Sequence, residues 1–596
     1  MVMDYSTLSD IWNEYDVVER KRFDAHDVSS AISELPKDSP EAQLCRYEAL
    51  AFGFTPHKGT NEWNTYYASQ WTFTKKDTGE EIHVPDIRDV DFACIAYWET
   101  RAGFVKNPLL KMRYTGLVLD FKKKITGVEP SFNAIKKANV DAIIAVVNGD
   151  YPKYDIVELD YADRGLDLSV RFRNQDLQTQ IVEAYFQAHK RFSNDDAKPG
   201  IWGKIFQSLI RHREAFSMYE PEIIKENLDR LERIEALALA EGEHTDRYAH
   251  LLEQQVDILC EYYHSIGDDI KIENLLDRLL VAMKKSISVR GGMWGQMMLE
   301  RIQRKYRNYN FDRKANRLFV DIKDLGGMTL RELKPVEYSV PVDGKIIESF
   351  LSEALSGDLN DALIRYLIEY IPIRQEEIRR LKENAEKYPL MDMVATVTID
   401  SSGNTMSRIG IGEDAEEQKL HHSMYENIRF STPLMHLHMG KLRQEKQLNL
   451  ETLMELFDGS PIMNDGNRDY FKKGFEAYLT GDDMVCCHLL IPQFEAAVRR
   501  LISLLGANIL RAQADPNDGN EYLSLDSLLE TETAKECFKE DLITYFKVVF
   551  TSKTGWNLRN LVSHGLLPSE SFNYMMSDRV VHCVLILSQF RVTEEK

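Results

Sequence analysis

The sequence predicts a mainly α-helical protein with several domains. Three observations support this fold class. Apolar residues recur at three- and four-residue spacing through most of the chain, short polar turns separate these runs, and only one short segment alternates in β-prone residues. With 596 residues, of which 43% are hydrophobic and 28% charged, the chain is long enough for about two to four domains.

Residues 1–130 are predicted to form a mixed, mostly helical domain. Residues 40–51 have a helical pattern, whereas residues 54–81 are irregular and rich in Trp, Gly and Lys. Further along, Pro108 precedes a run of apolar residues at helical spacing, and proline suits the first position of a helix. We expect a helix that begins there and enters a bundle.

Residues 131–388 are expected to form a helical, solenoid-like domain. Apolar residues have helical spacing in segments 180–189, 223–234 and 363–381, but no strict repeat period is present. This pattern indicates an irregular α-solenoid or bundle. Such a body is most simply a scaffold, and the alternative is a concave face that senses a triggering protein or ligand.

A change of pattern marks residues 389–460, which we interpret as a β-hairpin and a connecting region. Residues 394–400 alternate in β-prone residues and run into Asp400-Ser-Ser-Gly-Asn, which is a turn sequence. The hairpin is predicted at about residues 393–408 and joins the helical body to the last module.

The last module, residues 461–596, is predicted to be a compact helical bundle. A polar loop near residues 512–520 separates its two halves, and the final helix is expected to bury Val580, Val584 and Leu587. Its long helices are predicted over residues 468–479, 483–505, 533–550 and 569–590.

Composition excludes several classes of function. The formal net charge of -21 disfavours a chain that coats nucleic acid nonspecifically, because that binding needs clustered lysine and arginine. No apolar stretch reaches the length of about 18 residues that a membrane-spanning helix needs. The start of the chain has neither a basic segment nor an apolar one, so we expect a cytoplasmic protein. The seven cysteines are scattered and never spaced as CxxC, so neither a disulfide framework nor a zinc site is expected.

The segment with the clearest chemical meaning contains Arg559, Asn560 and His564, followed by Gly565. On a helix, Asn560 and His564 lie on one face, and the long side chain of Arg559 can reach across. Cleavage of RNA by its own 2'-hydroxyl needs a base, an acid and a cation beside the phosphate. A histidine transfers protons near neutral pH and a guanidinium grips two phosphate oxygens. The alternative is that Arg559 and His564 only brace the end of a helix.

This segment resembles the HEPN superfamily, and specifically the family defined by an RNxxxHG signature. The match is letter for letter at Arg559, Asn560, His564 and Gly565. The upstream segment 489–501 is similar to the preceding helix of that family, with Glu495 and Arg499 as polar residues among apolar ones. The resemblance covers residues 461–591, and residues 107–114 less specifically resemble the amino-terminal helical segment of such proteins.

The resemblance implies a metal-independent endoribonuclease that leaves a cyclic phosphate and a 5'-hydroxyl. Arg559 and His564 would be catalytic, Asn560 would give polar support, and no cofactor or metal would be needed. Eukaryotic relatives are linked to RNA degradation, and many bacterial ones act in antiviral defence or toxin systems. Some HEPN domains have lost catalysis, so a noncatalytic interaction or RNA-binding scaffold is the alternative function.

Two further expectations follow for the site. One histidine cannot easily act as acid and base on opposite sides of a phosphate, so a symmetric homodimer that brings two motifs together is favoured. Glu495 is either a neighbour of the active site or one half of a helix-surface ion pair with Arg499.

A second candidate RNA contact lies in the most basic stretch, residues 284–317. Arg304, Lys305 and Arg307 are interleaved there with aromatic residues, a combination that single-stranded RNA binding uses. Acidic residues interrupt the stretch, so a solvated helix face is the alternative. The histidines at 421–422 and at 436 and 438 lack further ligands at suitable spacing, and no metal site is predicted.

Overall fold

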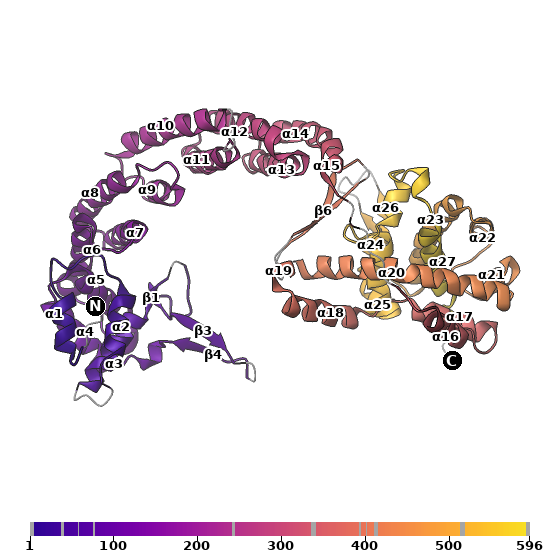
Figure 1. Cartoon of the computed structure of the whole chain (residues 1–596), viewed down its shortest axis with the longest axis horizontal. Coiled ribbons are helices and arrows are strands. Elements are labelled where there is room, and N and C mark those ends of the chain that lie inside the picture. Colours follow the sequence, from indigo (N-terminus) through magenta and orange to yellow (C-terminus); the bar gives the residue numbers. More distant parts are fainter. Residues whose placement is uncertain are drawn as a thin grey trace. The chain divides into compact units, whose positions relative to one another are not determined.

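The computed structural model shows a mainly helical chain that divides into two compact units, residues 1–324 and residues 325–596. Helices dominate both units, and the strands of the described residues form only two-stranded antiparallel sheets (Figure 1). This confirms the predicted fold class. No described helix combines the length and the apolar character needed to cross a membrane. The structure describes residues 5–36, 41–57, 59–75, 78–240, 245–334, 336, 341–392, 395–400, 402–410, 415–512 and 519–591.

The first part of unit 1 is a helical cluster with clear sequence signals at its helix starts. Thr7 and Asp24 each form a capping box. The predicted helix begins at Pro108, and Asn107 caps it. That helix ends at Gly127, whose φ of 73° suits glycine. The helices are α1 (Leu8–Tyr15), α2 (Ala25–Ser33), α3 (Ala42–Gly53), α4 (Phe92–Phe104) and α5 (Pro108–Thr126).

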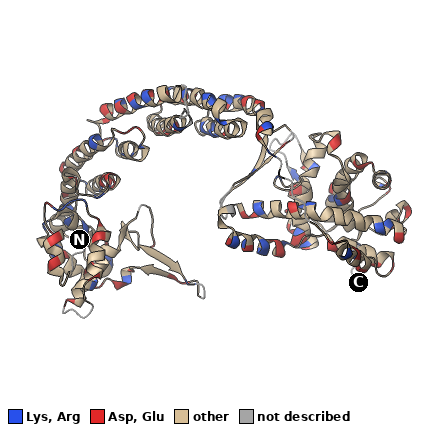
Figure 2. Ribbon diagram, viewed as in Figure 1, with Lys and Arg blue, Asp and Glu red and all other residues tan. Residues whose placement is uncertain are grey.

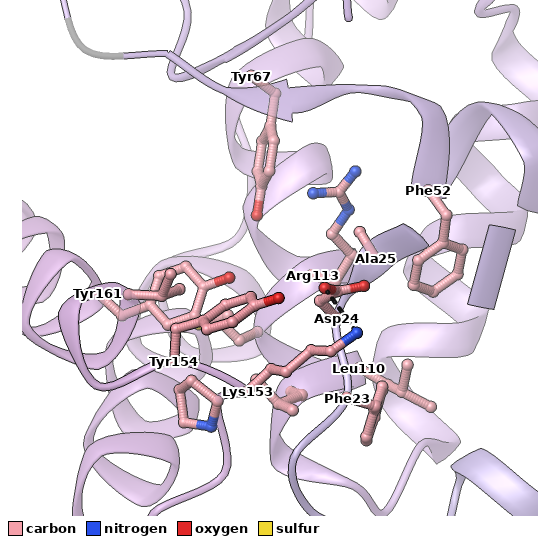
Figure 3. Close-up of a pocket in the computed structure, with 14 residues that line it drawn as sticks. Phe23, Asp24, Ala25, Phe52, Tyr67, Leu110, Arg113, Lys153, Tyr154 and Tyr161 are labelled. Atoms are coloured by element: carbon pink, nitrogen blue, oxygen red, sulfur yellow. Dashed lines mark ion pairs between the residues drawn. The ribbon is translucent and has the colours of Figure 1, made fainter. Parts of the chain in front are cut away.

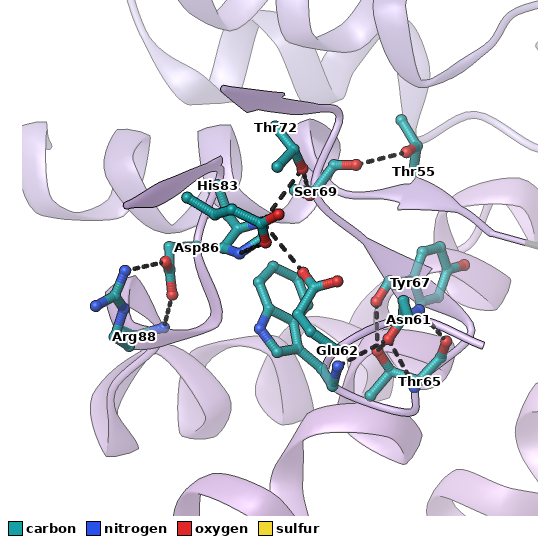
Figure 4. A network of polar contacts seen from close by, with 12 residues as sticks. Thr55, Asn61, Glu62, Thr65, Tyr67, Ser69, Thr72, His83, Asp86 and Arg88 are labelled. Atoms are coloured by element: carbon teal, nitrogen blue, oxygen red, sulfur yellow. Dashed lines mark hydrogen bonds and ion pairs between the residues drawn. The ribbon is translucent and has the colours of Figure 1, made fainter. Parts of the chain in front are cut away.

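The stretch between α3 and α4 forms two small sheets held by polar contacts (Figure 4). The sequence pattern predicts an irregular segment there. Asn61 closes a loop through bonds to Thr65, and the Thr65 hydroxyl donates to the carbonyl of Tyr67 at 2.6 Å. His83 Nδ1 lies 3.2 Å from a carboxylate oxygen of Glu62. The elements are β1 (Thr55–Pro56), β2 (Tyr67–Ala68), β3 (Trp71–Thr74), β4 (Glu81–Val84) and the turn η1 (Ile87–Asp89).

The rest of unit 1 is a row of helix pairs, as expected for an irregular solenoid. Consecutive helices pack on one another, and Figure 1 shows α8, α10, α12 and α14 along one layer and α7, α9, α11 and α13 along the other. The elements are η2 (Phe132–Lys137), α6 (Ala138–Gly149), α7 (Asp155–Arg171), α8 (Gln175–Phe192), α9 (Pro199–Arg211), α10 (Glu220–Ala238), α11 (Thr245–Ser265), α12 (Asp269–Arg290), α13 (Gly292–Asn308) and α14 (Asp312–Asp324).

Unit 2 begins inside the segment 131–388, which the sequence predicts to be one domain. The reason is the extent of its core, which runs from Leu355 to Leu587 and joins the helices before the hairpin to those after it. Its first elements are α15 (Gly326–Glu332), α16 (Gly344–Ala354), α17 (Leu359–Glu369), α18 (Arg374–Lys387), α19 (Pro389–Asp392), β5 (Thr396–Ile399), β6 (Thr405–Ile409), α20 (Glu416–Glu445) and α21 (Leu450–Glu455).

Strands β5 and β6 form the predicted hairpin, although residues 393, 394 and 401 of that segment lie outside the described residues. Gly403 in its turn has a φ of 82° and lies against the backbone of Gly326 in α15. A Cβ atom at Gly326 would be 2.2 Å from the carbonyl oxygen of Ser402. This close approach requires glycine at both positions.

The last helices of unit 2 surround α27, which is buried along nearly its whole length. Val580, Val584 and Leu587 are buried as predicted. Helices α17, α20, α22, α23 and α25 all pack on it. The elements are α22 (Arg468–Thr480), α23 (Asp483–Leu504), β7 (Leu510–Ala512), β8 (Asn520–Tyr522), α24 (Leu525–Leu529), α25 (Glu532–Phe550), α26 (Leu558–Ser563), η4 (Ser569–Ser571) and α27 (Tyr574–Ser588).

Candidate active site

The RNxxxHG motif lies on the short helix α26, which packs on α23 and α25 through the buried side chains of Leu558 and Val562. Asn557 before the helix has left-handed backbone angles, with φ 57° and ψ 29°. After the helix, Gly565 has φ 63° and its amide donates to the carbonyl of Val562. The glycine of the motif therefore serves the turn that ends the helix.

Arg559 joins α26 to α23 through an ion pair. Its Nε donates to a carboxylate oxygen of Glu495 at 2.9 Å, and the other oxygen of Glu495 accepts from Arg499 at 2.7 Å. Arg499 also donates to the carbonyl of Leu523 at 3.3 Å. The three charged side chains are partly exposed, with side-chain exposures of 26% for Arg559, 13% for Glu495 and 22% for Arg499. Glu495 is thus both a neighbour of the motif and an ion-pair partner of Arg499.

Asn560 orders the start of α26. Its amide nitrogen donates to the side-chain oxygen of Asn557 at 2.7 Å, and its own oxygen accepts from Arg559 at 3.1 Å. Both polar ends of this side chain are engaged within the chain. Asn560 therefore links the side chain of Arg559 to that of Asn557 at the start of α26.

His564 stands at the end of α26, and its side chain is exposed. Its backbone amide donates to the carbonyl of Asn560 at 3.1 Å. Among the described residues, its imidazole has no hydrogen-bond or ion-pair partner. The structure thus brings together Arg559, Asn560, Glu495 and Arg499. The His564 ring lies at the surface and not in the core of unit 2.

The basic stretch of unit 1 carries less free positive charge than its sequence suggests. Lys305 of α13 lies 2.5 Å from an oxygen of Asp257 and 3.3 Å from one of Glu253. Arg304 is exposed, and the exposed Arg307 lies over the ring of Phe319. Figure 2 shows both signs of charge along α12, α13 and α14. Of the three predicted RNA contacts, only the arginines keep an exposed charge.

Sequence reasoning missed a buried polar network on α27. Arg579 is fully buried and uses all five of its N–H donors. It donates to the carbonyls of Tyr370 and Ile428 and to the hydroxyls of Ser431, Thr432 and Tyr545. These partners come from three other segments of the chain, so no local sequence signal could have found them.

The neighbouring polar residues of α27 are also satisfied. Asp578 accepts from the Tyr478 hydroxyl at 2.6 Å and pairs with His436 at 2.8 Å. His582 contacts the carbonyl of Leu367 at 3.1 Å and the Tyr545 hydroxyl at 2.8 Å. Because a carbonyl only accepts, His582 donates through Nε2 and accepts through Nδ1. Burial lowers the pKa of His582 to about 3, so its ring is neutral.

Of the four histidines that invite a metal interpretation, two contact an acidic side chain. His436 pairs with Asp578, and His421 contacts Ser552 at 2.9 Å and Glu417 at 3.2 Å. Within the described residues, no group of three His, Cys, Asp or Glu side chains is placed to hold a metal ion.

Comparison with known proteins gives no relatives. No family model matches the chain, and neither a curated protein nor a solved structure is significantly similar to it.

Proposed function

We propose that this chain is a HEPN-type, metal-independent endoribonuclease whose site contains Arg559 and His564. The observation that carries the proposal is the geometry of α26. The imidazole of His564 lies at the surface at the end of this helix. The guanidinium of Arg559 is held by hydrogen bonds to Glu495 and Asn560. A histidine without an internal partner is free to exchange protons with a bound substrate.

In the proposed reaction, the 2'-hydroxyl of the RNA attacks the adjacent phosphorus and the bond to the 5'-oxygen breaks. The products are a 2',3'-cyclic phosphate and a 5'-hydroxyl. His564 takes the proton from the attacking hydroxyl or gives one to the leaving oxygen. Arg559 stabilises the charge that develops on the phosphate, and Glu495 holds the guanidinium in place.

A homodimer supplies the second histidine that this chemistry needs. Exposed apolar side chains beside the site suit such a contact. Leu566, two residues after His564, is 55% exposed, and Tyr522, whose ring lies under Arg499, is 64% exposed. A second copy that covered these two side chains would remove apolar surface from water. A two-fold axis near them would bring the two copies of His564 together.

The proposed enzyme is conditionally active. A net charge of -21 repels the RNA backbone at long range, so without a partner or ligand the encounter is slow, and cleavage by the chain alone needs a high RNA concentration. This fits a cytoplasmic effector of defence or toxin systems, whose cleavage stays slow until a signal arrives.

A noncatalytic interaction or RNA-binding scaffold is the second candidate function. The ion pair between Arg559 and Glu495 favours it, because a neutralised arginine that joins two helices has a structural role of its own. In that case the motif would stabilise α26, and the protein would bind RNA or partners without forming a product.

The test is an RNA cleavage assay with the purified full chain in EDTA. Cellular RNA is incubated with the wild type, with Arg559→Ala and with the matched surface variant Arg468→Ala, and the new ends are mapped. We expect cyclic phosphate ends with the wild type and with Arg468→Ala. With Arg559→Ala we expect a rate reduced about 10²- to 10³-fold, as when a group that stabilises a transition-state charge is lost.

Binding of RNA without new ends, under conditions in which the folded protein is saturated with RNA, would favour the scaffold. Cleavage that EDTA abolishes would contradict the metal-independent reaction. A rate for Arg559→Ala equal to that of the wild type would remove Arg559 from the site.

A further inference from the structure

Unit 1 contains a cavity, remote in sequence from the RNxxxHG motif, where four helices and a strand meet (Figure 3). Its walls come from the start of α2, the end of α3, strand β2, helix α5 and the start of α7. The space is about 60 Å³, and five of the fourteen lining residues are aromatic. The polar groups in the lining are those of Asp24, Arg113, Lys153 and the hydroxyls of Tyr67, Tyr154 and Tyr161.

Arg113 is the unusual residue of this cavity. It is only 6% exposed, and its Nε donates to the carbonyl of Ala51 at 2.6 Å, while another nitrogen donates to the carbonyl of Phe54. A guanidinium has five N–H donors, so three remain beyond these two bonds. No carboxylate of the described residues forms an ion pair with it.

The other cations around the cavity differ from Arg113 in having acidic partners. Lys153 lies 3.4 Å from Asp24 and 3.1 Å from Asp27. Arg164, which lines a smaller adjoining cavity, lies 3.5 Å from Asp120. Lys153 is therefore shared between two carboxylates, so Asp24, Asp27 and Lys153 together are negatively charged. Arg113 has no carboxylate partner among the described residues, although a buried charge usually has a counter-charge.

Tyrosine hydroxyls surround the same space. The guanidinium carbon of Arg113 lies 4.6 Å from the ring centre of Tyr67. The hydroxyl of Tyr161 makes no hydrogen bond with any described residue. Burial raises the pKa of both Tyr67 and Tyr161, so each hydroxyl remains a neutral donor at ordinary pH. Figure 3 shows the rings of Tyr67, Tyr154 and Tyr161 around the space beside Arg113.

The position of Tyr67 is itself fixed by the fold. Its backbone amide and that of Tyr66 donate to Asp120 at 3.0 and 2.9 Å, and the loop before it is closed by the Asn61 contacts of Figure 4. On the other side, a Cβ atom at Gly116 of α5 would lie 3.0 Å from the Tyr67 ring. The ring is therefore held against α5 before any ligand binds.

We infer that this cavity binds the anionic head, a carboxylate or a phosphate group, of a small organic ligand, with Arg113 as the anion-binding residue. The small volume admits the head group only. The exposed ring of Tyr154, 57% accessible at the edge of the cavity, offers a surface for a planar remainder of the ligand. The Tyr161 hydroxyl donates a second hydrogen bond to the same anion.

Binding of simple probes to the full chain tests this inference. Benzoate and phenyl phosphate represent the two anionic heads, and benzamide is the neutral counterpart of benzoate. We expect one site per chain, measured by calorimetry, for at least one of the anions and none for benzamide. The variants are Arg113→Gln and Tyr161→Phe, and Arg88→Gln is the control because it removes an exposed positive charge of the same unit.

Affinity should fall about tenfold or more in Arg113→Gln, since a hydrogen bond to a charged group is lost, and about three- to tenfold in Tyr161→Phe. Arg88→Gln should bind as the wild type does. If Arg113→Gln does not fold, the affinity of Tyr161→Phe tests the inference, because this variant removes only the hydroxyl oxygen and keeps the ring. The inference is overturned if neither anion binds, if benzamide binds as well as benzoate, or if Tyr161→Phe retains the wild-type affinity.

Discussion

Two polar regions of unit 2 contain arginine and histidine side chains, and they differ in how these groups are satisfied. Around α27, Arg579 has five hydrogen-bond partners and the ring of His582 has two, all within the core. Around α26, Arg559 is bound on one side, and the exposed His564 ring has no partner among the described residues.

The difference separates a structural region from a chemically available one. A buried group whose donors and acceptors are all occupied cannot engage a substrate without first losing those bonds. The exposed imidazole of His564, which has no partner among the described residues, keeps both ring nitrogens available for a group outside the chain. The same residue types thus stabilise the core at α27, whereas at α26 they remain available for the proposed reaction.

The largest expected effect on the free energy of unfolding concerns the buried network around α27. Replacing Arg579 by Met leaves two carbonyls and three hydroxyls without their donor, so the free energy of unfolding of unit 2 should fall by about 3–5 kcal/mol. Urea unfolding followed by circular dichroism measures this change. Arg429→Met, in which a half-exposed arginine of α20 is removed, should cost less than about 0.5 kcal/mol. Equal losses in the two variants would contradict a special role for Arg579.

A pH effect of about 2 kcal/mol is expected from the buried side chain of His438. Burial lowers the pKa of His438 to about 4 from the ordinary value of 6.5. Between these values the unfolded chain binds more protons than the folded one, so stability falls as the pH drops below about 6.5. From pH 7 to pH 5, wild type should lose about 2 kcal/mol more than His438→Phe, which lacks the titrating ring.

The measurement needs His438→Phe as its reference because other titrating groups increase the stability of the folded chain as the pH falls. Burial raises the pKa of Glu48 and of Glu158 in unit 1 to about 7, which favours the folded chain at lower pH. These contributions are common to both proteins and cancel in the difference. Parallel pH profiles of wild type and variant would show that His438 does not titrate with the expected shift.

A smaller effect is expected at the proposed dimer contact. Leu566→Glu places a charge on an exposed apolar position beside His564, so dimer dissociation should become at least about tenfold easier. Light scattering across a concentration series measures the constant, and Leu237→Glu, another exposed leucine in α10, serves as the control. A dimer that is equally stable in both variants would place the contact elsewhere.

The smallest effect is expected on the cleavage rate when Glu495 is replaced, because Glu495 positions Arg559 without touching the substrate. Glu495→Ala should lower the cleavage rate about tenfold, and Glu495→Gln, which keeps a hydrogen-bond acceptor for Arg559, should lower it less. The ratio of the two rates is the informative quantity. Equal rates in the two variants would show that the carboxylate does not act through that hydrogen bond.

Local patterns in the sequence predicted much of unit 2. The helices at α22, α23 and α25 begin and end within a residue or so of their predicted positions, and the i, i+4 pair of Glu495 and Arg499 forms as a helix allows. The last helix was predicted less well. It begins at Tyr574 rather than near residue 569, because Ser569–Ser571 forms a separate short turn.

Nonlocal contacts explain what the sequence did not predict. The bond between Arg579 and the carbonyl of Tyr370 joins residues 209 positions apart, and the pair of Arg559 and Glu495 joins residues 64 positions apart. The Arg113 cavity likewise collects side chains from five segments of unit 1. Such sites depend on tertiary packing, which neither periodicity nor residue spacing encodes.

The most direct test of the central claim is to measure cleavage and stability together for His564→Ala, with the exposed His26→Ala as control. We predict that His564→Ala lowers the RNA cleavage rate in EDTA by about 10²- to 10⁴-fold, with a free energy of unfolding within about 0.5 kcal/mol of the wild type. His26→Ala should change neither quantity. An unchanged cleavage rate, or a loss of activity that only follows unfolding, would contradict the claim that α26 carries the chemistry.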